Sequence, residues 1–341
     1  MNQPCSKTRL SRRLAVAPMM DWTDRHYRYL ARLISSRVLL YTEMITTGAL
    51  LHGMPERLLR YDPAEHPVAV QLGGSEPGDL ARCARLAAAA GFDEINLNVG
   101  CPSNRVQSGR FGACLMAEPE RVADCVAAMG DAVDLPVTVK TRIGIDYRDS
   151  YEALAGFITR VADAGCSTFV VHGRKAWLHG LSPKQNREIP PLRYDVVYRL
   201  KTDFPMLEIV LNGGVRSLED AAAHLQRVDG VMIGREAYHN PYFLAAVDQR
   251  FYHDCRPMPG RMEVVERYLL YVRRELAAGT ALRPLVHPLL GMFQGVPGAR
   301  VWRRRLSAGL QRPGAGAELI LDAALELSVR DEIACSAVAS G

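Results

Sequence analysis

Short apolar runs alternate with helix-like segments between residue 14 and about residue 235. Each run is rich in β-branched residues and stops at a glycine, a proline or a polar residue. Most runs are hydrophobic at nearly every position, which is typical of parallel strands buried on both faces. The pattern predicts eight strands: LAVAP (14–18), VLLYTEM (38–44), PVAVQL (67–72), EINLNVG (94–100), PVTVKTR (136–142), TFVVHG (168–173), EIVLNGG (208–214) and GVMIGR (230–235).

The segments between these runs carry helix-end signals. Residues 78–90 stop at Gly91 and residues 151–164 stop at Gly165, as glycine C-caps require. Ser217 opens a further helix with capping-box spacing. The regular alternation favours an α/β fold, a (β/α)8 TIM barrel. An open doubly wound sheet is the alternative, weakened by the lack of a GxGxxG turn after any early strand.

Polar side chains gather where the predicted strands end, and a barrel carries its active site at that rim. Any one of them could be an ordinary loop residue. A purely structural barrel, however, has no reason to concentrate polar groups on one rim, so the pattern predicts an active rim. The groups in question include Asp21, Glu43, Gln71, Asn98, Cys101, Lys140, Arg142, His172, Arg174, Asn212 and Arg235.

Two glycine-containing turns predict a phosphate site. Asn212-Gly213-Gly214 and Gly234-Arg235 follow the seventh and eighth strands, where barrels commonly bind a phosphate. Glycines let backbone N–H groups approach the phosphate oxygens, and the arginine adds positive charge.

Lys140 and His172 end the fifth and sixth strands and suit an electron-rich ring whose negative charge rises during reaction, such as a reduced flavin. Gln71 could bond the polar edge of that ring, and residues 18–20 (Pro18, Met19 and Met20) could lie along it. Lys140 could instead form a Schiff base, as in barrel aldolases.

Cys101 stands between Gly100 and Pro102, just beyond the fourth strand. Proline rules out immediate helix propagation, so the local backbone is unusual, and we expect a chemical role for this thiol. Cys114 in FGACLM is an intermediate case. The eight cysteines form no CxxC pair, which indicates reduced thiols in a reducing compartment. Those expected to be buried small hydrophobes are Cys83, Cys125 and Cys166.

The composition is that of an ordinary globular protein, with 341 residues, 48% of them hydrophobic. No apolar run is long enough for a membrane span, and no apolar stretch follows the basic start to make a secretory signal. The net charge of +5 is modest, but residues 261–312 carry ten arginines, no lysine and three glutamates, a formal charge of +7. We expect a basic N-terminal tail (1–13), a catalytic barrel (14–255) and a small helical domain with a basic face (261–330).

Several stretches are similar to the tRNA-dihydrouridine synthases. They are VAPMMDWTDRHYR, YTEMITTGAL, INLNVGCPS, VKTRIGID, VHGR and LNGGV with IGRE. GRFGACLM, GLSPKQNREIPPL and FQGVPGARVWRRRLS resemble the bacterial A subgroup in particular. The similarity runs in matching order from about residue 14 to residue 310.

The resemblance implies an oxidoreductase that uses FMN, reduced by NADPH, to saturate the C5=C6 bond of a uridine in the tRNA D-loop. Hydride would pass to C6 and Cys101 would give a proton to C5. The target base would leave the RNA stack to reach the barrel. The A-subgroup likeness points to uridines 20 and 20a.

The expected residues follow from both lines of reasoning. Cofactor contacts are expected from Pro18, Met19, Met20, Gln71, Lys140, His172, Asn212, Gly213, Gly214, Gly234 and Arg235. Contacts to tRNA are expected from Asn98, Lys184, Arg187, Arg300 and Arg303. We expect no metal, no membrane and no protein partner, and a monomer in the cytoplasm.

Three other functions remain open at this level. The chain could be an FMN barrel oxidoreductase acting on a free small molecule. It could be an RNA-binding protein or tRNA chaperone with a vestigial flavin site. It could also be a Schiff-base aldolase that uses Lys140.

Overall fold

The computed structural model describes residues 10–327. Most of the predicted N-terminal tail (1–13) and the end of the predicted helical domain (261–330) therefore lie outside the described residues. Within residues 10–327, no helix is long and apolar enough to cross a membrane.

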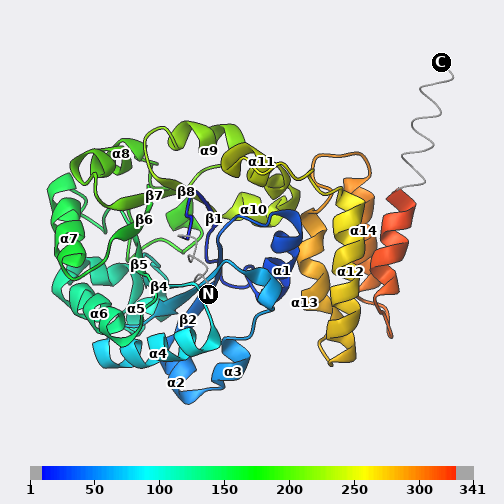
Figure 1. The fold of residues 1–341 in the computed structure, drawn as a ribbon, viewed down its shortest axis with the longest axis horizontal. Coiled ribbons are helices and arrows are strands. Elements are labelled where there is room, and N and C mark those ends of the chain that lie inside the picture. Colours follow the sequence, from blue (N-terminus) through cyan, green and yellow to red (C-terminus); the bar gives the residue numbers. More distant parts are fainter. Residues whose placement is uncertain (1–9, 328–341) are drawn as a thin grey trace, which may run out of the picture. The chain divides into compact units, whose positions relative to one another are not determined.

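Eight parallel strands form one sheet in the order β1-β8-β7-β6-β5-β4-β3-β2 (Figure 1). A bridge between Ala15 and Leu39 joins the first strand to the start of the second and closes the barrel. The TIM-barrel prediction is confirmed, and the open-sheet alternative is wrong. The strands are β1 (Leu14–Val16), β2 (Leu40–Thr46), β3 (Val68–Gly73), β4 (Glu94–Val99), β5 (Val137–Arg142), β6 (Thr168–His172), β7 (Glu208–Asn212) and β8 (Gly230–Ile233).

All eight strands are present, but the predicted ends need correction. The seventh strand stops at Asn212, because Gly213 and Gly214 take positive φ angles of 108° and 77° that no strand accommodates. The second strand runs two residues further than 38–44 predicts, and its register with β3 shifts between Tyr41 and Met44. Apolar patterning locates a buried strand but does not mark where its hydrogen bonding stops.

Helices and turns follow the strands in two compact units. The first unit holds residues 10–18, 39–60 and 66–233 of the described chain. Its helical elements are α2 (Thr47–His52), α3 (Pro55–Leu58), α4 (Pro77–Ala90), α5 (Asn104–Ser108), η2 (Gly112–Ala117), α6 (Pro119–Ala132), α7 (Tyr151–Asp163), η3 (Gln185–Arg187), α8 (Tyr194–Asp203) and α9 (Leu218–His224).

The second unit holds residues 19–38, 61–65 and 234–327. The helical pattern predicted over residues 261–312 is confirmed, and residues 318–327 add a further helix. The other elements are α1 (Arg25–Ile34), η1 (Pro63–Glu65), α10 (Arg235–His239), η4 (Pro241–Ala246), α11 (Val247–Tyr252), α12 (Arg261–Ala277), α13 (Leu282–Val286), η5 (His287–Gly291) and α14 (Ala299–Gly309).

Helix ends follow the signals in the sequence. Gly91 ends α4 in the left-handed conformation, as its C-cap position predicts. The Ser217 side chain accepts from the Asp220 backbone N–H at the start of α9. Only this half of the predicted capping box forms, because the Asp220 carboxylate accepts from the backbone N–H of Arg216 instead.

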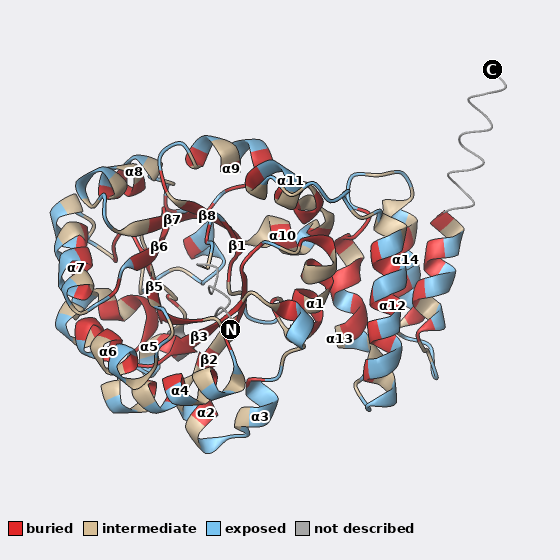
Figure 2. Cartoon of the chain, viewed as in Figure 1, coloured by how far each residue is buried: buried red, intermediate tan, exposed pale blue. Residues whose placement is uncertain are grey.

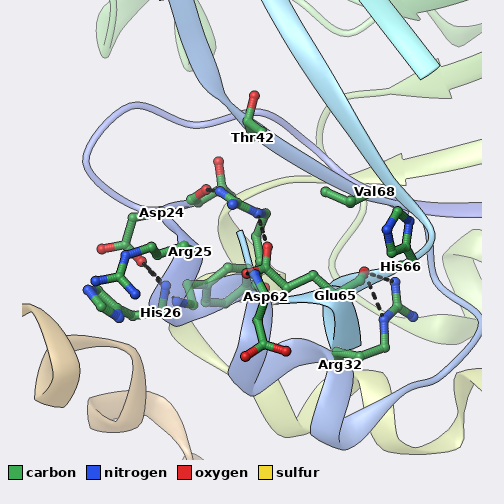
Figure 3. Close-up of polar contacts among 12 residues, drawn as sticks. Asp24, Arg25, His26, Arg32, Thr42, Asp62, Glu65, His66 and Val68 are labelled. Carbon is green, nitrogen blue, oxygen red and sulfur yellow. Dashed lines mark hydrogen bonds and ion pairs between the residues drawn. The ribbon is translucent and has the colours of Figure 1, made fainter. Parts of the chain in front are cut away.

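The second unit is organised around α1. Its N-cap Asp24 accepts from the backbone N–H groups of His26 and Tyr27, and Arg32 donates to the Glu65 backbone oxygen (Figure 3). Arg28 forms a buried ion pair with the Glu65 carboxylate at 2.6 Å. These bonds attach the short segment 61–65 to the helix.

Most residues of the eight strands are buried (Figure 2). Near the N-terminal ends of the strands, the buried Arg12 guanidinium bonds Glu94 at 2.6 Å and Glu208 at 2.8 Å. Desolvation lowers the pKa of Arg12, but the two carboxylates outweigh it and raise the pKa overall. The Tyr41 hydroxyl also donates to Glu94, at 2.6 Å, so this carboxylate is fully bonded inside the barrel.

We predict that Arg12→Met lowers the free energy of unfolding by about 3–5 kcal/mol, because Glu94 would stay buried without its cation. Urea denaturation followed by circular dichroism would measure the loss. Arg82→Met is the matched control, since its pair with Asp79 at 2.7 Å is exposed and contributes about 1 kcal/mol or less. Equal losses in the two variants would contradict the role given to the buried pair.

Candidate active site

A ladder of polar side chains runs along the inner face of β4. Glu94, Asn96 and Asn98 alternate along the strand, so all three point to one side of it. Asn96 lies opposite Gln71 of β3 and accepts from its Nε2 at 2.8 Å. Asn98 Nδ2 donates to the other end of the same amide, Gln71 Oε1, at 2.8 Å. All four side chains are buried, so each amide has one orientation that satisfies its neighbours.

Thr138 of β5 completes the ladder. Its hydroxyl accepts from Asn96 Nδ2 at 2.8 Å and donates to Glu94 Oε1 at 2.6 Å. A continuous chain of hydrogen bonds therefore joins the buried Arg12–Glu94 pair to Asn98 at the C-terminal end of β4.

Asn98 determines where the cysteine stands. Its Oδ1 accepts from the backbone N–H of Gly100 at 3.1 Å and of Cys101 at 3.0 Å. The chain thus turns sharply as β4 ends, in the manner of an Asx turn. The Cys101 side chain is partly exposed, and its Sγ lies 3.6 Å from the Ser103 hydroxyl. Cys83, Cys125 and Cys166 are buried, as expected.

The FGACLM segment returns to the same point. Ala113 donates its backbone N–H to the Cys101 carbonyl at 2.9 Å. Gly112 has a φ of 77°, and a Cβ on it would lie 2.6 Å from the Cys101 oxygen. A glycine is required here because the two backbones approach so closely. Both ends of segment 101–113 are therefore joined at the cysteine.

Arg142 ties this loop to the one that follows β6. Its Nε donates to the Gly100 carbonyl at 2.8 Å, and one terminal nitrogen donates to the carbonyls of Lys175 and Asn186, both at 3.1 Å. Desolvation, with Arg174 and Arg187 nearby, lowers the pKa of Arg142 to about 10. The guanidinium is buried among carbonyl oxygens, and no carboxylate of the described residues pairs with it.

Lys140 and His172 stand on neighbouring strands close to Arg142. Lys140 is the register partner of Asn98, and His172 is the partner of both Arg142 and Asn212. Desolvation and the charge of Arg142 lower the pKa of Lys140 to about 7.

His172 is held neutral in one tautomer. Burial, followed by the charges of Arg142 and Lys140, lowers the pKa of His172 well below its usual range. Its Nδ1 accepts from the Arg174 backbone N–H at 3.2 Å, which assigns the proton to Nε2. The ring therefore presents an N–H donor at its other edge.

The end of β7 is shaped to let a ligand come close to the backbone. A Cβ on Gly213 would lie 3.0 Å from His172 Nε2, and its φ of 108° also disfavours any other residue. Tyr194 holds the turn by donating to the Gly213 carbonyl at 2.8 Å. The Asn212 side chain is used internally, because its Nδ2 donates to the Met232 carbonyl at 2.8 Å.

The site therefore has an excess of positive charge. Lys140 and Arg142 have no ion pair to any carboxylate within residues 10–327, and Cys101 is the one acidic group whose charge raises the pKa of either. A buried cation such as Arg142, with the half-buried Lys140 beside it, is costly unless an anion joins them. Together with a neutral N–H donor and a glycine cradle, they form a donor set that fits an anionic, phosphate-bearing ring.

The structure brings together some of the residues that the sequence singles out and leaves others apart. Gln71, Asn98 and Cys101 share one hydrogen-bond network. Pro18 follows β1, and Lys184 and Arg187 are exposed at η3. Four others belong to the second compact unit and are described only within it: Met19, Met20, Gly234 and Arg235.

In that unit, the Met19 backbone N–H donates to the Thr23 hydroxyl at 2.9 Å, and Gly234 is the N-cap of α10. Arg300 and Arg303 are exposed on α14, as RNA contacts require. Arg303 also donates to Gln294 Oε1 at 2.6 Å.

Two site residues, Asn96 and Asn186, escaped the sequence reasoning, and a third, Arg142, was placed on the rim without a specific function. Asn96 repeats the polar alternation of β4, which is a readable signal in a strand otherwise expected to be apolar. The sequence predicts that Arg142 ends a strand, but it does not predict the hydrogen bonds that the guanidinium makes. Asn186 is buried and orders the loop after β6, and nothing in its local sequence indicates that.

Comparisons with known proteins found a matching family and similar proteins. Residues 15–328 match the family described as dihydrouridine synthase (Dus). A tRNA-dihydrouridine(20/20a) synthase from Shewanella oneidensis is 60% identical over 91% of this chain and 92% of its own. Proteins of the same description from Vibrio cholerae (59% identity, 94% of this chain and 98% of theirs) and Escherichia coli K12 (58%, 93% and 92%) are also similar.

A solved structure of a 2-naphthoyl-CoA reductase complex aligns with a TM-score of 0.54 at 12% identity. The alignment covers 70% of this chain and 50% of the reductase. At that identity, the likeness supports the barrel fold alone.

We predict that Arg142→Lys loosens both loops that the guanidinium joins, because a lysine keeps the charge but cannot reach three carbonyls. Hydrogen exchange measured by mass spectrometry should be about ten-fold faster in residues 100–113 and 174–187, since hydrogen bonds to a charged donor contribute about 1.5–3 kcal/mol each. Arg148→Lys, at an exposed position of the next turn, is the control. Unchanged exchange in Arg142→Lys would show that the loops are held by other contacts.

Proposed function

Since the chain belongs to the dihydrouridine synthase family, we propose that it reduces a uridine of tRNA to 5,6-dihydrouridine with a bound flavin. The observation that carries the proposal is the placement of Cys101, on a loop bonded to Asn98 and Arg142, beside a cationic site without a carboxylate partner. Relatives about 60% identical are named tRNA-dihydrouridine(20/20a) synthases, so we assign uridines 20 and 20a of the D-loop as targets.

FMN fits the donor set of the site, with NADPH as its reductant. When bound and reduced, FMN supplies the hydride. Lys140 would hold negative charge on the ring, His172 would donate from Nε2, and the Gly213-Gly214 turn would meet the phosphate or the ring edge with backbone N–H groups. Gln71 keeps one N–H beyond its bond to Asn96 and could offer it to the ring. The sequence assigns Pro18, Met19, Met20, Asn212, Gly234 and Arg235 to the same cofactor, and these assignments stay predictions.

Cys101 would be the proton donor. Reduction of the uracil C5=C6 bond requires one proton at C5, and a thiol can supply it when it is held at a fixed place. Asn98 holds the thiol's backbone through its Oδ1, and it keeps one N–H of Nδ2 for the edge of the uracil. Arg142 fixes the same loop from the other side.

Exposed basic side chains would bind the RNA backbone. Lys184 and Arg187 lie at the start and the end of η3, and Arg300 and Arg303 lie on α14. We propose that residues 14–255 form the catalytic barrel and residues 261–330 a tRNA-binding domain. Its formal charge of +7 over residues 261–312 suits the phosphate backbone. A cytoplasmic location and a monomeric state stay predictions.

We expect Cys101→Ala to keep its flavin and its reduction by NADPH, and to lose turnover on tRNA. Loss of a positioned acid slows a reaction by about 10²–10⁴-fold. Anaerobic stopped-flow absorbance would follow flavin bleaching with NADPH and its return with unmodified tRNA. Cys114→Ala is the control thiol, since the Cys114 Sγ bonds the Phe111 carbonyl and the proposed reaction assigns it no role.

Two results would contradict parts of the proposal. Equal rates of flavin return in Cys101→Ala and wild type would remove the proton-donor role. A wild-type flavin that NADPH bleaches and tRNA does not restore would instead support an oxidoreductase acting on a free small molecule.

We also predict that FMN binding takes up a proton at Lys140. In the free site the pKa of Lys140 is about 7, below its model-compound value of 10.5, so the group loses its proton as pH rises through 7. An anionic ring favours the charged form and restores the proton. Uptake should therefore grow between about pH 6 and pH 9.

Titration calorimetry of the flavin-free protein in buffers of different ionisation enthalpy measures this uptake. Lys140→Arg keeps a permanent charge and should remove the pH-dependent part, because arginine does not titrate in this range. Identical proton uptake in wild type and Lys140→Arg would show that another group titrates.

A further inference from the structure

An aromatic pair stands on the loops that follow β5 and β6. Tyr147 is 88% exposed, and its ring centroid lies 5.2 Å from that of Trp177, with the ring planes at 84°. Lys175 Nζ lies 4.4 Å from the centroid of the Trp177 ring. An exposed ring next to a second ring offers a flat apolar surface on which a ligand with its own aromatic face can stack.

The turn that carries Tyr147 is tightly built. Ile145 and Arg148 exchange two backbone hydrogen bonds, of 3.2 and 2.8 Å, around Asp146 and Tyr147. Asp146 has a φ of 46°, a left-handed conformation that aspartate adopts more readily than most residues with a Cβ. The turn leaves the Tyr147 ring exposed.

Three further hydrogen bonds hold the turn in place. The Leu178 backbone N–H donates to Asp146 Oδ1 at 2.8 Å. Lys175 Nζ donates to the Asp146 carbonyl at 3.0 Å and to Asp149 Oδ2 at 2.8 Å. The acidic groups next to Tyr147 are thus engaged within the loop pair.

The backbone of Trp177 is also fixed by hydrogen bonds. The Asn186 side chain accepts from the Trp177 backbone N–H at 2.7 Å and donates to its carbonyl at 2.9 Å. Asn186 is fully buried, and its own carbonyl accepts from Arg142, which also binds the Cys101 loop through Gly100. The aromatic pair and the thiol therefore belong to one hydrogen-bonded framework.

A small apolar cluster makes the same connection. Ala113, which bonds the Cys101 carbonyl, packs with Ile145 and Ala176, and Met116 and Leu178 lie against them. Ile145 precedes the Tyr147 turn, and Ala176 precedes Trp177. The platform is consequently fixed to the rim on which the target base would react.

We propose that Tyr147 and Trp177 form a stacking platform for an unpaired nucleobase of the substrate RNA, other than the base that is reduced. This inference rests on the proposed function, since that reaction requires a base to leave the RNA stack, and neighbouring bases then lose a stacking partner. Aromatic rings take such bases with little sequence preference. Exposed Arg148, Lys184 and Arg187 supply charge for the accompanying phosphates.

The test combines Tyr147→Ser with Trp177→Leu and measures tRNA binding and single-turnover flavin return. We expect tRNA affinity to fall about ten-fold or more. The rate of flavin return at saturating tRNA, the flavin content and the KM for NADPH should stay near wild type. Tyr147→Phe keeps the ring and should bind as wild type. Met206→Ser, which removes a 92% exposed side chain preceding β7, is the control for loss of surface apolar area.

Salt dependence separates stacking from charge. The slope of affinity against salt should be unchanged in Tyr147→Ser/Trp177→Leu, and it should fall in Arg300→Ala/Arg303→Ala. Quenching of tryptophan fluorescence by tRNA should shrink in Trp177→Phe. An unstructured oligouridylate should compete for the platform, and a blunt RNA duplex of equal length should not.

Three outcomes would contradict the proposal, and each leads to a different conclusion. Wild-type affinity and quenching in the variants would overturn the platform while leaving the reaction intact. A selective rise in the KM for NADPH would assign the platform to the adenine of the reductant and overturn the RNA assignment. A wild-type protein whose flavin tRNA does not restore would overturn the proposed function and the platform with it.

Discussion

The hydrogen bonds of Asn98 are the interaction on which the site depends. One amide group turns the chain at the end of β4, fixes the backbone of Cys101 and joins Gln71 on the neighbouring strand. It can do so only because Asn96 and Thr138 fix the orientation of the Gln71 amide from below. A reactive loop is thus positioned by the rigid interior of the barrel, where a fully bonded polar network has one arrangement.

The electrostatics of the rim follow from the same interior. Glu94 is neutralised by Arg12 at the far end of the ladder, so it lends no negative charge to the cations at the mouth. Lys140 and Arg142 of β5 therefore lie beside His172 of β6, and burial together with the charge of Arg142 lowers the pKa of both Lys140 and His172. Placing these cationic groups next to one another lowers the stability of the folded protein. The arrangement is explained if the site binds an anionic cofactor whose charge balances theirs.

The barrel could be predicted from the sequence because eight buried runs separated by capped helices admit few topologies. The placement of Cys101 and Lys140 at one rim could be predicted because the ends of neighbouring parallel strands meet there. The hydrogen bonds by which Arg142 joins two loops could not be predicted, since its partners are backbone carbonyls of residues far apart in the sequence. The division of the chain into two compact units could not be predicted either. Helix α1 follows the first strand, but its ion pairs to Glu65 and Glu275 place it in the second unit.

Asn186 shows how structure and function meet in this protein. It is buried in a loop that carries no strand or helix beyond one short turn, and its side chain and backbone bond Trp177 and Arg142. A loop needs such an internal support when it must keep side chains exposed, because it has no apolar core of its own. A loop that only connects two elements would not need the hydrogen bonds of Asn186. They are explained if the rings above Asn186, and the thiol tied to it through Arg142, must meet one RNA in a fixed relation.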